Sequence, residues 1–100
     1  MVKLIVTYGH PVDPEAFEKY YAETHAPIAA RIKGPVKAEF TKLIGTPDGG
    51  KPESYRLAEL WFESVDDLQA AMASDEGQAT VADLANFATG GVTVAIGEVG

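Results

Sequence analysis

The stretch YRLAELWF, from Tyr55 to Phe62, decides how this chain folds. It is rich in aromatic and aliphatic residues, which favours a β-strand. Alternation along a strand places its apolar side chains on both faces, with Tyr55, Leu57 and Trp61 on one and Ala58, Leu60 and Phe62 on the other. An antiparallel sheet with one face in water should instead alternate apolar with polar residues. We therefore expect a sheet that is covered on both faces.

The segments around this stretch predict three more strands and two helical regions. The strands are expected at residues 2–8, 36–45 and 92–99. The first helix is predicted to begin after Asp13, which can cap free N–H groups, and to end at Gly34. The second helical region is predicted to follow Ser64, to break at Ser74, and to end near Phe87. The resulting order of elements is βαββαβ.

This order predicts an α+β fold of the ferredoxin-like type, a four-stranded antiparallel sheet with helices on one face. A length of 100 residues with 46% hydrophobic content predicts a single domain over residues 1–100. The helices cover one face of the sheet, and no element remains for the other. We therefore expect a homodimer in which a second copy covers the open face.

Composition excludes several classes of function. A net charge of −7 argues against nucleic acid or an anionic membrane as partner, because their phosphates would be repelled. The absence of cysteine excludes disulfides, thiolate nucleophiles and Fe–S clusters. His10 and His25 are the only histidines, so one chain cannot form a three-histidine metal site. The apolar run near the start is too short for a signal peptide or a membrane span, so we expect a cytoplasmic chain.

The block YYAETHAPIAARIKG, residues 20–34, combines a helical pattern with His25 and Pro27. The apolar stripe of this helix is predicted to contain Phe17, Tyr21, Thr24, Ile28 and Ile32. At about 100° per residue, His25 falls at the edge of that stripe. Pro27 lacks an N–H group and should free the carbonyl of Glu23. We expect one ring nitrogen of His25 to bond either that carbonyl or a carboxylate across a pocket.

Two roles for His25 remain open on the sequence. Its imidazole could be a general acid or base that lines a pocket between helix and sheet, because the ordinary pKa of a histidine side chain suits proton transfer near neutral pH. It could instead be a boundary histidine that bonds a backbone group near the proline and holds the helix in position.

The tyrosines are the other candidates for contact with a ligand. Tyr8, Tyr20, Tyr21 and Tyr55 could each hydrogen-bond a phenol, an enol or a carbonyl group. Tyrosines at boundary positions also serve as amphipathic packing residues, which is the alternative for each of them.

Glu59 and Trp61 lie on the predicted strand amid apolar neighbours. If Glu59 were buried, its pKa would rise and it could pair with His25 as a proton partner. The alternative is an ion pair at the dimer contact, for example with Lys42 or Arg56. Trp61 is expected to supply core and pocket wall, and with Glu59 it completes the set of predicted substrate-binding residues.

The pattern F-x-x-Y-Y-x-x-x-H-x-P, from Phe17 to Pro27, is the most specific feature of the chain. With the opening KLIVTYGHPVDPEAFEKYY and the later LAELWFESVDDLQAAMAS, it resembles the EthD family of the dimeric α/β-barrel superfamily. The resemblance covers nearly the whole chain. It implies a homodimer whose two sheets face each other as a barrel, with the helices outside and a pocket for a small organic molecule.

The resemblance also implies classes of function. The first is a cofactor-independent enzyme or enzyme accessory of the oxygenase, cyclase or decarboxylase type. It would act on a small hydrophobic or aromatic compound in the catabolism of ether-type or polyketide-like molecules, with His25 transferring the proton. No metal and no other cofactor is expected, since an acidic chain offers few cations for the propionates of a haem.

Two further readings stay open. The chain could be a non-catalytic carrier that binds a small molecule, or a dimeric structural protein without a site. A pocket that contains His25 and one more polar group would favour the enzyme. A wholly apolar pocket would favour the carrier, and a closed helix–sheet interface would favour the structural protein.

Overall fold

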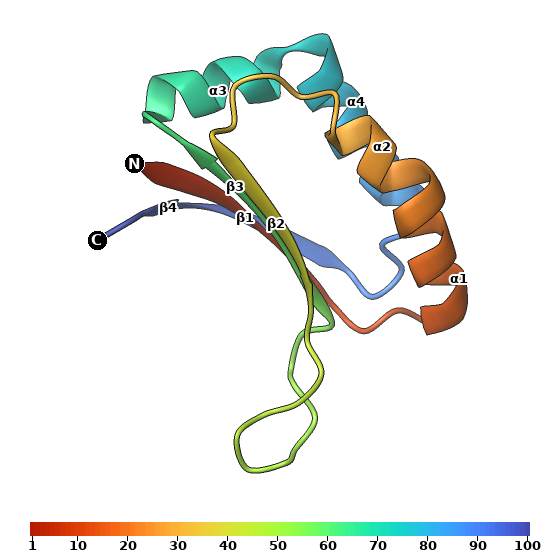
Figure 1. Ribbon diagram of the computed structural model, residues 1–100. Coiled ribbons are helices and arrows are strands. Elements are labelled where there is room, and N and C mark those ends of the chain that lie inside the picture. Colours follow the sequence, from red (N-terminus) through yellow and green to blue (C-terminus); the bar gives the residue numbers. More distant parts are fainter.

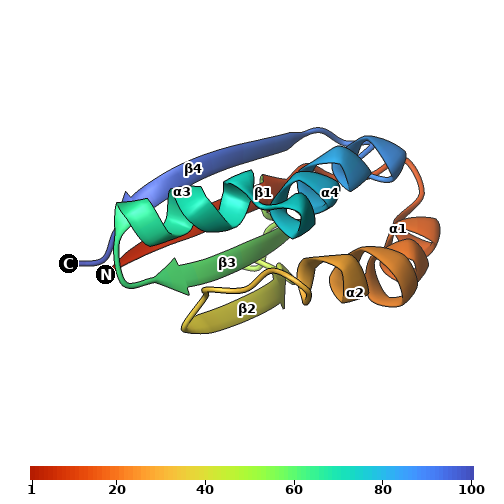
Figure 2. The same ribbon diagram turned by 90° about the horizontal axis from the view of Figure 1, so that it is seen from above.

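The computed structural model describes residues 1–100 and has one four-stranded antiparallel sheet with all helices on one face (Figures 1 and 2). The strands are β1 (Val2–Tyr8), β2 (Lys37–Lys42), β3 (Arg56–Phe62) and β4 (Val92–Glu98). Their order in the sheet is β2-β3-β1-β4, and every neighbouring pair is antiparallel. This confirms the predicted ferredoxin-like fold.

The helical elements follow the sequence signals closely, with a break in each region. They are α1 (Pro14–Tyr20), η1 (Tyr21–His25), α2 (Ala26–Ala29), α3 (Val65–Ala73), α4 (Asp75–Asp83) and η2 (Leu84–Asn86). Asp13 caps α1 by accepting a hydrogen bond from the N–H of Ala16 at 3.1 Å. Ser64 and Ser74 cap α3 and α4 in the same way, so the predicted break at Ser74 is confirmed.

The hydrophobic core lies between the sheet and the helices. The strands contribute Val2, Leu4, Val6, Tyr8, Ala58, Leu60 and Phe62, which alternate along β1 and β3 as the strand period requires. Phe17, Tyr21 and Leu68 meet them from the helical layer. Each large side chain buried here stabilises the fold by roughly 1.5–3 kcal/mol. The core therefore holds both helical regions against the same face of the sheet.

The first helical region is not one regular α-helix, which corrects the predicted stripe. Residues 21–25 form a π-helical turn, and the N–H of Ala26 donates to the carbonyl of Tyr21, five residues back. Pro27 has no N–H to continue the α-helical pattern. A π-turn holds more residues than an α-turn, so side chains four apart stay on one face. Phe17, Tyr21 and His25 are buried in consequence, and Thr24 is only partly buried.

The open face of the sheet is less apolar than predicted. Strand register places Ile5, Leu57 and Trp61 on this face together with charged residues. Lys3 and Glu59 form an ion pair at 2.6 Å, and the ammonium groups of Lys3 and Lys37 lie 5.1 and 4.7 Å from the ring centre of Trp61. The homodimer that would cover this face stays a prediction.

Tyr55 is the other correction to the predicted sheet faces. It precedes β3 and packs on the helix side, with its ring 5.1 Å from that of Phe17. The chain between β2 and β3 extends beyond the end of the sheet, where most of its residues are exposed (Figure 1). Among the helices, none combines the length and the apolar character that crossing a membrane requires.

Candidate functional site

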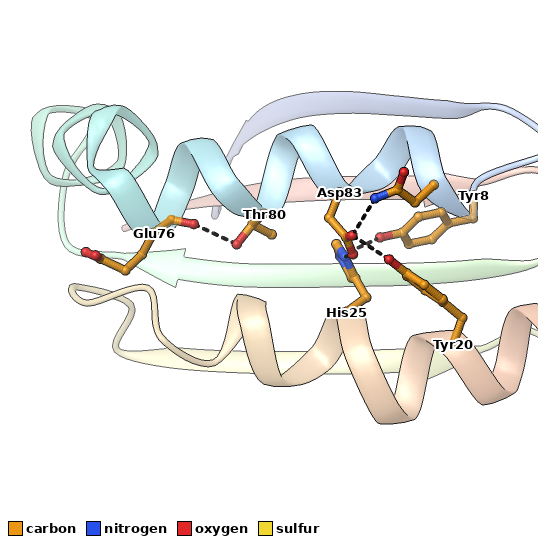
Figure 3. A network of polar contacts seen from close by, with 7 residues as sticks. Tyr8, Tyr20, His25, Glu76, Thr80 and Asp83 are labelled. Carbon is orange, nitrogen blue, oxygen red and sulfur yellow. Dashed lines mark hydrogen bonds and ion pairs between the residues drawn. The ribbon is translucent and has the colours of Figure 1, made fainter.

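His25 is buried between the two helical regions and bonds a carboxylate across the chain. Only 3% of the residue is exposed, because the π-turn rotates it from the edge of the helix into the core. Its Nδ1 lies 2.8 Å from Oδ2 of Asp83, the last residue of α4 (Figure 3). Of the two partners expected for a ring nitrogen, the carbonyl of Glu23 and a carboxylate, the structure shows the carboxylate.

Asp83 is held by three side chains. The hydroxyl of Tyr20 donates to its Oδ1 at 2.6 Å, and the amide of Asn86 donates to the same oxygen at 3.0 Å. Burial by itself would raise the pKa of Asp83, but the hydrogen bonds from Tyr20, Asn86 and His25 outweigh it and lower that pKa below its usual value. The carboxylate is therefore ionised at neutral pH.

The ionised carboxylate determines the state of the imidazole. It can only accept hydrogen bonds, so Nδ1 of His25 carries a proton. In the neutral ring, Nε2 is then left as an acceptor, on the side of β1. Its neighbour is the hydroxyl of Tyr8, at 3.4 Å, which is long for a hydrogen bond. Nε2 is thus the one atom of the pair that is available to take a proton.

An apolar cavity lies against this pair, between the sheet and the helices. His25 and Tyr8 line it, and most of its wall is apolar, including Leu4, Val6, Leu60, Met72, Leu84 and Val94. The space in it that the centres of water-sized molecules can occupy is about 40 Å³, and the space free of atoms is about 450 Å³ with the open mouth included. Thr80 also lines it, but its hydroxyl already donates to the carbonyl of Glu76 at 2.8 Å (Figure 3).

Tyr21 stands beside this cavity in an aromatic cluster. Its ring lies 5.6 Å from that of Tyr8 and 6.3 Å from that of Phe40, both of which line the cavity. Burial raises the pKa of the Tyr21 hydroxyl and outweighs the opposing effect of the nearby Arg56 guanidinium. Burial, followed by the neighbouring Tyr21, also raises the pKa of Tyr8 far above its ordinary value. Both hydroxyl groups therefore keep their protons and can donate hydrogen bonds.

The structure brings four of the six predicted site residues together and separates the other two. Tyr8, Tyr20, Tyr21 and His25 gather on the helix-covered face. Glu59 and Trp61 lie on the open face, because they alternate with the core residues Ala58 and Leu60 along β3. The predicted pairing of Glu59 with His25 is therefore wrong. Within the chain Glu59 pairs with Lys3, and its ion pair at the dimer contact stays a prediction. Arg56 pairs with Glu18 at 2.8 Å.

The sequence analysis did not single out Asp83 or Asn86. A signal was present, because Asp83 lies four residues before the buried Phe87 and so shares its side of the helix. A charged residue at such a position is rarely buried without a partner. No group of three or more histidine or carboxylate side chains is placed to hold a metal ion.

Comparisons with known proteins agree with this architecture. The model of the EthD domain matches residues 9–91. An uncharacterised 11.0 kDa protein from the thcB-thcC intergenic region of Rhodococcus erythropolis is 43% identical over 94 residues, which are 94% of this chain and 90% of the relative. The crystal structure of an ethyl tert-butyl ether (EthD) family protein from Bacillus halodurans is 38% identical and superposes with a TM-score of 0.92. That match covers 100% of this chain and 99% of the other.

More distant structures share the fold. SnoaB, a cofactor-independent oxygenase from Streptomyces nogalater, superposes with a TM-score of 0.68 at 17% identity over 98% of this chain and 91% of its own. A dimeric ferredoxin-like protein of unknown function from Bacteroides fragilis superposes with a TM-score of 0.70 at 17% identity over 98% and 95% of the two chains. Since the EthD model spans most of the chain and the relatives above 30% identity cover nearly all of it, this protein belongs to the EthD family.

Proposed function

We propose that this protein is a small enzyme that transfers a proton to or from a small apolar organic compound, with His25 as the acid or base and no resident cofactor. The observation that carries the proposal is the buried His25–Asp83 pair, whose free nitrogen lies at an apolar cavity. A pocket with a histidine and further polar groups is the arrangement expected of an enzyme, as opposed to a carrier.

Each residue of the pair has a role in this proposal. Nε2 of His25 takes the proton from the substrate, and the adjacent carboxylate of Asp83 stabilises the imidazolium that forms. The hydroxyl group of Tyr8, which lines the cavity, is a protonated donor beside the place where negative charge would develop on the substrate, and the Tyr21 ring packs against that of Tyr8. Tyr20 and Asn86 touch only the carboxylate in this network, so they position Asp83.

Several reaction types share this first step. A cyclase, a decarboxylase and an isomerase each need a proton moved at an apolar substrate. In an oxygenation, the deprotonated substrate would itself supply electrons to dioxygen, and the structurally similar SnoaB, a cofactor-independent oxygenase, supports that variant. Ether-type and polyketide-like compounds are the substrates that membership of the family favours.

A carrier without catalysis is the second candidate. It is favoured by the wall of the cavity, which is apolar except for His25, Tyr8 and Thr80. In that case the His25–Asp83 pair would hold the two helical regions together and would take no part in chemistry.

We also propose that the protein works as a cytoplasmic homodimer with its sheets face to face. Support comes from Ile5, Leu57 and Trp61, which lie on a face that no helix covers. The similar Bacteroides fragilis protein is described as dimeric, which is consistent with such an assembly.

Proton exchange on a model ketone separates the enzyme from the carrier. We expect the protein to accelerate exchange of the activated methylene protons of 2-tetralone with deuterated water, followed by nuclear magnetic resonance. His25→Asn should retain binding of the ketone and lower the rate about 10²- to 10⁴-fold. The matched control is His10→Asn, because His10 bonds the carbonyl of Pro52 at 2.7 Å, away from the cavity.

Either of two results would remove the enzymatic proposal. One is binding of the ketone with exchange no faster than in buffer, which would favour the carrier. The other is a His25→Asn variant that folds normally and exchanges as fast as the unchanged protein.

A further inference from the structure

An apolar groove on the helix side of the sheet continues the cavity outward. It lies between α3 and β4, the strand at one edge of the sheet (Figure 2). Three side chains line both the cavity and the groove, namely Leu4, Met72 and Val94. The rest of the groove wall has one polar side chain and consists of Leu68, Gln69, Ala73, Ala95 and Ile96. The cavity beside His25 and the groove therefore form one continuous apolar path.

Strand register gives the direction and the length of this path. Tyr8 lines only the cavity, whereas Leu4, four residues earlier on β1, lines both spaces. Leu4 lies opposite Ile96 on β4, so the groove reaches that level of the sheet. Four residues of a strand span about 14 Å, at roughly 3.4 Å each. A ligand whose polar end lies at His25 and Tyr8 must therefore be elongated to reach Ile96.

The outer part of the path leaves apolar surface open to water. Val94 is 52% exposed and Ile96 is 50% exposed, although both are on the side of the sheet that the helices cover. Burying such side chains under another apolar group is favourable, and the gain grows with the area that is covered. The apolar tail of a bound ligand would cover them.

The inner part of the path determines what kind of molecule can follow it. The centres of water-sized molecules can occupy about 40 Å³ of the cavity. One water needs ~10–15 Å³ by this measure, so the cavity admits part of a small molecule but no segment of a protein. No charged side chain lines the groove, so a charged tail would lose its water without gaining a partner. Met72, at the junction, has a flexible unbranched side chain that can adapt to the tail.

We infer that the ligand of this site is an elongated molecule with one polar end and a slender, uncharged apolar tail. The polar end lies at His25 and Tyr8, and the tail leaves the cavity past Met72 and extends along the groove to Ile96. This inference deepens the proposed function and rests on it for the position of the polar end. The groove thus sets the length of the ligand, and the His25–Asp83 pair acts at its polar end.

A series of methyl ketones tests the inference, because only the length of the tail changes along it. We expect the affinity to rise about two- to fourfold for each methylene group added from 2-pentanone to 2-decanone, since each one buries apolar area. Nuclear magnetic resonance of ¹³C-labelled methyl groups measures the affinity and locates the tail. The signals of Val94 should shift with all the longer ketones, and those of Ile96 only with the longest.

A charge at the outer end of the groove gives the matched variant. Ile96→Asp should weaken binding of 2-decanone about tenfold or more and change that of 2-pentanone by less than about twofold, because only the long tail reaches this residue. Ile96 is half exposed, so the variant should fold. Val99→Asp is the control and should alter neither affinity, because Val99 is 44% exposed and does not line the groove.

Three results would overturn the inference. The first is equal affinity for 2-pentanone and 2-decanone. The second is a gain with length that Ile96→Asp leaves intact, which would place the tail elsewhere. The third is a dimer that Ile96→Asp dissociates together with no gain in affinity along the series, which would assign the groove to a second copy of the chain.

The two proposals fail in different ways. A gain in affinity with tail length, without any proton exchange on 2-tetralone, would remove the enzymatic role and leave the groove as the site of the tail. Exchange on 2-tetralone without a gain along the series would do the reverse.

Discussion

Asp83 lies on the helix-covered side of the sheet and is buried, whereas Glu59 lies on the open face and is partly buried. The two carboxylates differ in the number of side chains that bond them. Asp83 is 7% exposed and receives hydrogen bonds from Tyr20, Asn86 and His25. The side chain of Glu59 is 18% exposed and has one partner, the ammonium group of Lys3.

The difference shows which carboxylate can serve a site. Three donors from separate elements fix the orientation of Asp83, so it can in turn fix the tautomer of His25. An ion pair near the surface adds little stability, because water competes for both charges. The open face therefore has charges that a second subunit could rearrange, whereas the covered face has a network that tolerates little change.

Removing each carboxylate tests this comparison and should give the largest effect. We expect Asp83→Ala to lower the free energy of unfolding by about 3 kcal/mol or more, since it leaves buried partners unpaired. Glu59→Ala should cost about 1 kcal/mol or less. Urea denaturation followed by circular dichroism measures both. Equal losses would show that the two faces hold their charges alike.

A charge in the middle of the open face tests whether a second copy covers it. The unchanged protein should sediment as a dimer at micromolar concentration, and Leu57→Asp should weaken the dimer at least about 100-fold, which corresponds to about 2.7 kcal/mol. Val12→Asp is the control, because Val12 is 86% exposed in the loop after β1. A monomeric unchanged protein, or a Leu57→Asp dimer of full strength, would contradict the barrel.

Acid should weaken the Asp83 network by a smaller amount. The pKa of Asp83 is lowered in the folded protein, so its ionisation favours folding above the usual carboxyl pKa, near 4. That contribution is lost as the pH falls through the lowered value. The difference in unfolding free energy between the unchanged protein and Asp83→Asn should shrink as the pH falls below ~4. A difference that grows below pH ~4 would reverse the assigned sign.

Local signals in the sequence were sufficient for the elements and for part of the site. The alternation in YRLAELWF, the caps at Asp13, Ser64 and Ser74, and the βαββαβ order predicted the sheet and the helical layer. These signals act between residues that are close in the chain, so they can be read without the fold. The same holds for His25, whose position near Pro27 already indicated a partner for its ring.

Contacts between distant residues were beyond the sequence. His25 and Asp83 are 58 residues apart in the chain, and α4 brings them together only when both helical regions pack on the same face. A regular helix of 100° per residue places His25 at the edge of the apolar stripe. The π-turn at residues 21–25, which the hydrophobic pattern does not reveal, buries it instead. Glu59 was also considered as a partner of His25, although strand alternation places its side chain on the opposite face of the sheet.

By itself, the sequence determined the order of the elements, the aromatic content of the core and the choice of His25 as the residue to examine. Tertiary structure decided which carboxylate reaches His25 and which tyrosine lies at its free nitrogen. The physical reason is that a hydrogen bond depends on distances of about 3 Å and on direction, and these follow from the packing of whole elements.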